Sequence, residues 1–502
     1  MTTILYKRIT SLFLLLALAT SSCDDFFDVN ESPNSLTEVP PATLLPPIIS
    51  TLGYYAYGNF SLYTGSIMQY YAGHRGQPLQ YAQLDFRASD TDNSWSAIYS
   101  GVLEDAAALQ QQATVTEQPA YVGIAQILKA NSYLLLTDIY GDIPFSQANN
   151  IDEFITTEYD AQEAVYNGII EMLNNGIENV QADDASYVGD EDLIYEGDMD
   201  KWVRYANTLK LRALNHLSLR QPNAAQEFLS TNPLLMESNA DNALVPFFDD
   251  VNQYNPRYQF DNVSGREDAA VSETFVNMLT ALNDPRFLYY FEPIRNGDLE
   301  GTVAGNYPGD TQDDSGRERF SRVGLSLAGP DAPAVLASYA ETQFIIAEVM
   351  QRAGNAAAAQ EAYENAVTAS LNYHSAVAGG ATYPGTGVEI PEISEDDIAT
   401  YLAQQTVSYS AAANKLERIM EQKYIALYTM PYEAWVDYRR VGDANYPDLV
   451  NPLNNRTQNR IPLRLPYPQL EIDLNGVNLQ NGPGIPVPNE TLVTQSLWWD
   501  VQ

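Results

Sequence analysis

The feature that most restricts the fold of this chain is the recurrence of apolar residues every three or four positions. In the segment 121–139, apolar residues stand at positions 124, 127, 128, 134, 135 and 139. That spacing places them on one face of an α-helix. The same pattern recurs in the segments 161–180, 200–219, 335–350, 356–371 and 411–428. The chain is therefore predicted to be mainly helical.

Two of these helices form a pair. The segments 335–350 and 356–371 are joined at Gly354-Asn355, and glycine just past a helix end supplies the left-handed residue that stops it. Small residues beside Tyr363 in the second helix resemble tetratricopeptide packing, although no clean 34-residue repeat is present. Long irregular stretches separate the helical blocks at 237–266, 293–333, 376–392 and 440–502. We therefore predict a mostly all-α fold, with a tetratricopeptide-like helical repeat scaffold packed against a loop-rich lobe.

The charge balance excludes several kinds of partner. The 502 residues include 65 acidic and 26 basic side chains, for a formal net charge of −39. A nucleic-acid binder needs a basic footprint, so this chain is predicted to bind no nucleic acid. The same charge argues against adhesion to an anionic membrane surface. Apolar residues make up 45%, enough for a sizeable core.

The N-terminus predicts export and lipidation. Lys7 and Arg8 precede the apolar run 12–19, which is too short to span a bilayer and is typical of a signal peptide. The small residues 20–22 lead to Cys23, the only cysteine, in a pattern that resembles a bacterial lipobox. The alternative is an ordinary secretory signal with an incidental cysteine.

These features divide the chain into three parts. Residues 1–22 are predicted to be the lipoprotein signal peptide, and 23–47 the lipidated N-terminus and tether, which is rich in Pro, Asn, Ser and Thr. Residues 48–502 are predicted to form a single helical domain with an interwoven loop lobe. No later segment has about 18 uninterrupted apolar residues, so membrane attachment is expected through the lipid alone.

No catalytic or metal-binding motif emerges. The patterns H-E-x-x-H, G-x-S-x-G and G-x-x-x-x-G-K-[ST] are absent from the sequence. The acidic clusters at 90–92 and 310–314 lack the glycine that an EF-hand loop needs, and they read as solvated loops. A glycosidase-like pair of carboxylates cannot be selected from 65 acids by sequence. We expect no enzyme, no cofactor and no metal.

Aromatic residues give the positive signal. The segment 53–74, GYYAYGNFSLYTGSIMQYYAGH, is dense in tyrosine. Such rings stack on sugars or on peptide side chains, and their hydroxyls bond polar groups at the rim. The alternative is that these rings pack in the hydrophobic core along one face of a helix, because Tyr63, Ile67 and Tyr70 have helical spacing. The candidate ligand-binding residues are Tyr54, Tyr55, Tyr57, Tyr71, His74, Arg75 and Trp95.

Several motifs together resemble the SusD/RagB family, and its SusD-like 2 branch in particular. They are CDDFFDVNESPN after the signal, LTDIYGDIPFSQA at 136–148, YDAQEAVYNGIIEML at 159–173, GDMDKWVRYANTLKLR at 197–212, VLASYAETQFIIAE at 335–348, QKYIALY and EAWVDYRR within 416–440, and IPLRLPYPQLE at 461–471. The resemblance implies four tetratricopeptide-like units and a lipoprotein of the Bacteroidetes outer membrane that faces the cell surface. It also implies capture of oligosaccharide or peptide for a SusC-like TonB-dependent transporter.

Two other functions stay open at this point. A glycan-degrading surface enzyme would form product, and a helical-repeat scaffold would bind protein only. The negative charge favours neutral or cationic cargo over polyanionic glycans.

Overall fold

The computed structural model describes residues 39–150, 153–182, 184–266, 268–311, 316–482 and 493–501. The chain separates into two compact units, Met1–Pro40 and Pro41–Gln502. The predicted signal peptide and Cys23 lie outside the described residues.

Helix α2 (Pro41–Tyr55) opens the second unit and begins inside the segment that was expected to be an extended tether. Residues 41–47 are therefore helical, although Pro46 and Pro47 lie within the helix. Burial explains the difference, because Leu45, Ile48 and Ile49 are fully buried in the core. The apolar area that they remove from water offsets the helix-breaking cost of the prolines.

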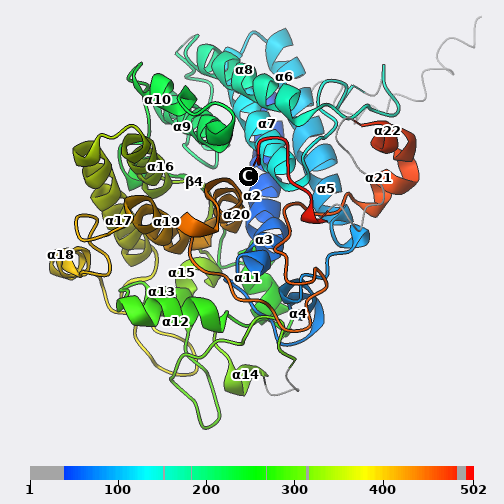
Figure 1. The fold of residues 1–502 in the computed structure, drawn as a ribbon. Helices are drawn as coiled ribbons and strands as arrows, with labels where there is room; N and C mark the ends of the chain where they lie inside the picture. Colours follow the sequence, from blue (N-terminus) through cyan, green and yellow to red (C-terminus); the bar gives the residue numbers. More distant parts are fainter. Residues whose placement is uncertain are drawn as a thin grey trace, which may run out of the picture. The chain divides into compact units, whose positions relative to one another are not determined.

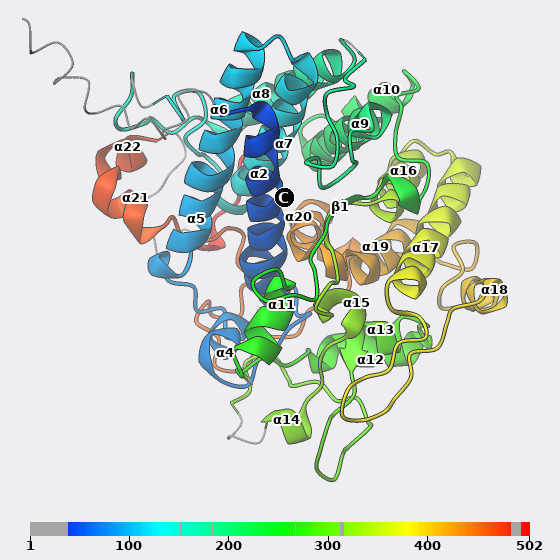
Figure 2. The same ribbon diagram turned by 180° about the vertical axis from the view of Figure 1, so that it is seen from behind.

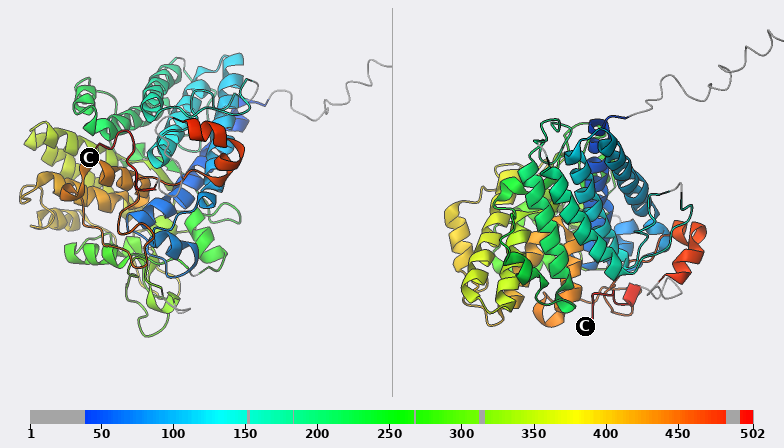
Figure 3. Two further views of the ribbon diagram at one scale, coloured as in Figure 1. Left: turned by 45° about the vertical axis from the view of Figure 1, so that its right-hand side comes forward. Right: turned by 90° about the horizontal axis from the view of Figure 1, so that it is seen from above.

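Long helices form a packed series (Figure 3), in which α6 contacts α7, α7 contacts α8, α8 contacts α9, α9 contacts α16, and α16 contacts both α17 and α19. Their bounds are α6 (Glu104–Val115), α7 (Pro119–Tyr140), α8 (Gln162–Val180), α9 (Met199–His216), α16 (Tyr339–Arg352), α17 (Ala356–Ala378), α19 (Lys415–Ala426) and α20 (Pro431–Val441). The predicted mostly helical, tetratricopeptide-like fold class is confirmed.

Strands are few and short in the described part of the chain. Strand β1 (Ala243–Val245) pairs antiparallel with β4 (Ala334–Ala337), and β2 (Phe291–Glu292) pairs with β3 (Arg322–Val323). The helix predicted over 335–350 was wrong at its start, because the first residues are strand and Ser338 caps α16 by accepting a hydrogen bond from the Glu341 amide. A short buried apolar run fits either a strand or a helix, so periodicity alone could not separate them.

Short elements make up the loop-rich lobe and the connections (Figures 1 and 2). The α-helices are α3 (Ser61–Ile67), α4 (Gly76–Ala82), α5 (Asp92–Ile98), α10 (Ala224–Leu229), α11 (Pro256–Tyr258), α12 (Glu273–Leu282), α13 (Phe287–Tyr290), α14 (Gly316–Arg319), α15 (Leu325–Ala328), α18 (Glu395–Ala403), α21 (Gln469–Leu474) and α22 (Gly476–Asn481). The π-helices are η1 (Ala56–Phe60), η3 (Tyr99–Leu103) and η6 (Gln259–Val263). The 3₁₀-helices are η2 (Ala88–Asp90), η4 (Leu217–Leu219), η5 (Asn239–Asp241), η7 (Leu427–Thr429) and η8 (Asp443–Asn445).

A buried ionic cluster joins α9, α16, α19 and α20. Glu348 binds Arg440 through two nitrogens, and it also accepts a hydrogen bond from Asn215 at 3.1 Å. Asp437 pairs with Arg440 at 2.6 Å and with Lys423 at 2.8 Å. These residues are almost fully buried, so each charge depends on its partners for stabilisation.

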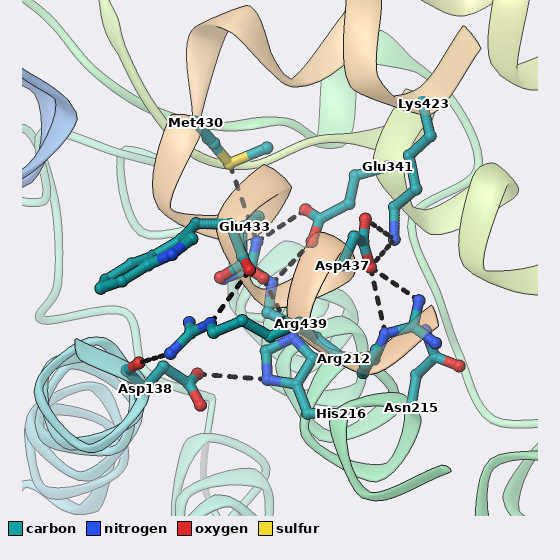
Figure 4. A network of polar contacts seen from close by, with 12 residues as sticks. Asp138, Arg212, Asn215, His216, Glu341, Lys423, Met430, Glu433, Asp437 and Arg439 are labelled. Carbon is teal, nitrogen blue, oxygen red and sulfur yellow. Dashed lines mark hydrogen bonds and ion pairs between the residues drawn. The ribbon is translucent and has the colours of Figure 1, made fainter. Parts of the chain in front are cut away.

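The cluster continues toward α7 through a buried histidine (Figure 4). His216 lies between two carboxylates, with Nδ1 3.1 Å from Asp138 and Nε2 3.0 Å from Glu433. Arg212 pairs with Glu341 at 2.6 Å and lies 3.5 Å from Glu433. His216 is therefore part of the helix packing.

Candidate functional site: an aromatic cavity in the loop lobe

A cavity of about 450 Å³ lies in the loop lobe. Its walls come from the α2–η1–α3 region, from α4 and the following loop, and from α11 and η6. Figure 1 shows α4 and α11 near α3, where α4 contacts α3 and α11 contacts η1. This volume is within the range of small-molecule binding sites.

Two π-helical turns contribute to the cavity wall. Gly58 and Asn59 come from η1, and Gln259, Phe260 and Asp261 come from η6. π-Helical turns are rare and occur frequently at functional sites, because the wide turn redirects side chains from the regular helical face. Their occurrence on both walls of one cavity marks this region as the candidate site.

Aromatic rings line much of the cavity. Tyr54 is half-buried, and its hydroxyl donates to Gln259 Oε1 at 3.2 Å, which links the two walls. Tyr63 and Tyr81 meet edge to face at 5.2 Å, and Phe86 stacks on Tyr81 at 5.3 Å. Burial raises the pKa of the Tyr63 and Tyr81 hydroxyls, so both are neutral groups at ordinary pH.

Polar groups stand among the rings. Asp90 accepts hydrogen bonds from the Arg87 amide at 2.9 Å and from Gln80 Nε2 at 2.8 Å. Burial raises its pKa above the ordinary value for an aspartate. Arg257 and Asp261 are nearly fully buried at the cavity lining, and Asn59 donates to the Tyr63 hydroxyl at 3.3 Å. The site thus offers apolar faces together with hydrogen-bonding groups, the combination that suits a carbohydrate.

The structure places the predicted tyrosines in different surroundings. Tyr54 and Tyr71 line the cavity. Tyr57 is buried beneath the Arg257 guanidinium, whose carbon lies 5.0 Å from the ring centroid. Tyr55 is half-buried and packs edge to face against Tyr54 at 5.4 Å.

The other predicted residues lie outside the cavity lining. His74 is buried, with its ring 6.0 Å from that of Phe320. Arg75 Nε pairs with Asp268 at 2.7 Å. Trp95 is buried against Tyr99 and Tyr140, with ring centroids 4.7 Å and 5.0 Å away. In this structure the contacts of Trp95 serve the packing of α5.

Sequence reasoning missed the wall formed by residues 256–264. Arg257, Gln259, Phe260 and Asp261 belong to the stretch 237–266, which was predicted only to be irregular. The one available signal was its length, because long loops inside a compact domain are usually functional.

Two observations on the described residues concern metal ligands and membrane-spanning helices. No group of three or more His, Cys, Asp and Glu side chains is placed to hold a metal ion there. In the same part of the chain, no helix has the length and apolar character needed to cross a membrane.

The fold and the site define a tetratricopeptide-like helical protein with an aromatic-lined cavity in its loop lobe. The family model SusD-like_2, described as "Starch-binding associating with outer membrane", matches residues 33–468, and the chain belongs to this family. The predicted SusD/RagB membership is confirmed.

Solved structures agree with this assignment. A SusD/RagB family protein from Bacteroides thetaiotaomicron has a TM-score of 0.77 and 25% identity, and the match covers 92% of this chain and 99% of that one. A SusD homologue from Bacteroides fragilis has a TM-score of 0.75 and 26% identity over 92% and 99% of the two chains. A chitin-binding protein shares the fold, with a TM-score of 0.76 and 24% identity over 92% and 100%. A comparison with curated protein sequences finds no match.

Proposed function

We propose that this protein is a cell-surface lipoprotein that binds oligosaccharide or peptide nutrients in the aromatic cavity and delivers them to a SusC-like TonB-dependent transporter. Oligosaccharide is the cargo that we favour. The observation that carries the proposal is the cavity of about 450 Å³, where tyrosine rings alternate with amide and carboxylate groups in a chain of a starch-binding family. Tyrosine rings stack on the apolar faces of sugars, while amide and carboxylate groups form hydrogen bonds with the hydroxyls of the sugar.

Binding without cleavage is the direct test of this function. The mature chain from residue 24 to residue 502 would be titrated calorimetrically with a panel of oligosaccharides and peptides, and each mixture would then be analysed for products by chromatography. We expect a bound oligosaccharide that is recovered intact. Product formation would favour the enzyme alternative, and binding to protein partners alone would favour the scaffold.

The cavity rings are expected to contribute measurably to affinity. Tyr54→Ala and Phe260→Ala each remove one ring from the cavity lining, and a ring contact contributes about 0.5–1.5 kcal/mol beyond area burial. We therefore expect each variant to bind the panel ligand roughly 2- to 13-fold more weakly. Tyr339→Ala is the matched control, because Tyr339 is half-buried on α16 and does not line the cavity. Equal loss in all three variants would contradict this role of the cavity.

Anchoring depends on Cys23 in this proposal. In cells grown with a labelled fatty acid, the native chain should carry label and Cys23→Ser should carry none, because acylation requires the thiol. The native protein should also co-purify with a β-barrel transporter from detergent-solubilised outer membranes. Label on the Cys23→Ser variant would mean that the lipid is attached elsewhere, and a native protein released without lipid would support the ordinary secretory signal instead.

A further inference from the structure

The side chain of Arg257 is the most unusual polar group in the cavity. It is only 8% exposed, yet it contributes to the lining. Its guanidinium carbon lies 5.0 Å from the ring centroid of Tyr57 and 4.6 Å from that of Tyr71. One terminal nitrogen donates to Ser61 Oγ, whereas Nε is buried and has no hydrogen-bond partner. Two rings and a hydroxyl therefore hold the guanidinium in place, while its Nε–H remains without an acceptor.

Three other buried arginines in this protein have carboxylate partners. Arg212 pairs with Glu341, Arg286 with Asp284, and Arg440 with both Glu348 and Asp437. Among the described residues, no carboxylate lies within 4.0 Å of the Arg257 nitrogens. Charged side chains are seldom buried without an ion-pair partner, because transfer of the charge from water is costly.

Asp261 is not the ion-pair partner of Arg257. Its carboxylate also lines the cavity and favours the charge of Arg257 from a distance, but the two groups form no ion pair. Arg257 is thus a cation at the cavity lining that pairs with no carboxylate among the described residues.

A second donor lies beside Arg257. The Tyr71 hydroxyl is buried close to both Ser61 and the Arg257 guanidinium, and its interactions with them oppose the rise in its pKa that burial causes. Tyr71 also contributes to the cavity lining. A carboxylate has two acceptor oxygens, and it can accept from a guanidinium and a phenol together in charge-assisted hydrogen bonds. A neutral hydroxyl would satisfy these donors less well.

We propose that the cavity binds an acidic oligosaccharide, and that a carboxylate of this ligand pairs with the Arg257 guanidinium. This assignment rests on the proposed function and narrows its ligand class. It reverses the expectation of neutral or cationic cargo, which came from the net charge of −39. Interactions of exposed charges are screened within about 10 Å in salt solution, so the buried cation in contact with the ligand decides the preference.

The test compares acidic ligands with their neutral counterparts. A glycan array would carry oligosaccharides containing glucuronate, galacturonate or sialate beside the same molecules reduced at the carboxyl group. Hits would then be titrated calorimetrically. We expect the acidic form to bind at least about 10-fold more tightly than the reduced form, because one charge-assisted pair is lost on reduction.

Two substitutions assign the preference to the side chain. Arg257→Gln should reduce the affinity for the acidic form about 10-fold or more, and leave that for the reduced form within about 3-fold. Arg257→Lys keeps the charge without the planar fork, so it should retain part of the preference. Thermal melting would establish that each variant is folded. If Arg257→Gln does not fold, the native protein still decides, because the proposal requires it to bind the acidic form more tightly than the reduced form.

Several outcomes would overturn the assignment. They are tighter binding of the reduced or of cationic oligosaccharides, and an equal loss of both ligand forms in folded Arg257→Gln. Each would leave the proposed binding function intact. An array without any glycan hit would instead remove carbohydrate binding itself, so the two failures can be distinguished.

Discussion

Replacing Glu348 by glutamine is expected to lower the free energy of unfolding by roughly 3–5 kcal/mol, because it removes one partner from a buried ionic cluster. Glu348 is fully buried and bound by both terminal nitrogens of Arg440, with Arg352 at 3.0 Å on its other side. These cations hold the pKa of Glu348 well below its usual range despite burial. With a neutral amide at position 348, Asp437 would be the one remaining carboxylate that pairs with Arg440. Urea unfolding followed by circular dichroism would measure the loss.

A matched control separates this effect from the loss of an acidic charge. Glu361 is exposed on α17, and Glu361→Gln should change the unfolding free energy by no more than about 0.5 kcal/mol. The double variant Glu348→Gln/Arg440→Met should recover part of the stability, because the unpaired cation is also removed. If Glu348→Gln were as stable as Glu361→Gln, the cluster would not stabilise the helix packing.

The helical scaffold could be predicted because its signal is local. In α7, apolar residues at helical spacing define the buried face, and the sequence prediction of 121–139 agrees with the observed Pro119–Tyr140. The turn between α16 and α17 also follows the sequence, since Gly354 has a positive φ of 77° just beyond the helix end. Signals of this kind depend on residues within a few positions of one another, so a single sequence is enough to predict these helices and the turn between them.

The candidate site depends on contacts that no local pattern encodes. The aromatic run predicted a ligand-binding region near Tyr54 and Tyr71, which do line the cavity, although their contact with ligand stays a prediction. The opposite wall is distant in the chain, since Tyr54 and its hydrogen-bond partner Gln259 are 205 positions apart. The unpaired state of Arg257 is visible only once the carboxylates around it have been located.

Stability should also fall as the pH rises from 6.5 to about 9, because His216 is buried as a cation between two carboxylates. Asp138 and Glu433 raise the pKa of His216 from 6.5 to about 9 against the opposing effect of burial. A group with a raised folded-state pKa contributes its full stabilisation below the unfolded pKa and loses it as the pH rises through the folded value. The contribution is roughly 3 kcal/mol, at about 1.36 kcal/mol for each pKa unit.

His374 should act in the opposite direction at lower pH. Burial, with Arg286 nearby, lowers the pKa of His374 well below 6.5, so the folded protein holds this histidine neutral. Protonation then favours the unfolded chain as the pH falls below 6.5, and the two histidines together give maximum stability near that pH. Urea unfolding between about pH 5 and pH 9 would test this.

The variant His216→Gln should flatten only the alkaline side of the pH profile, and His374→Gln only the acidic side. Buried tyrosines do not interfere, since their raised pKa values place their titration above 10, beyond the range of this experiment. If the alkaline slope persisted in His216→Gln, a group other than this histidine would be responsible. Because His216 contacts Asp138 of α7 and Glu433 of α20, loss of its proton should loosen α20 from the helices that pack against it.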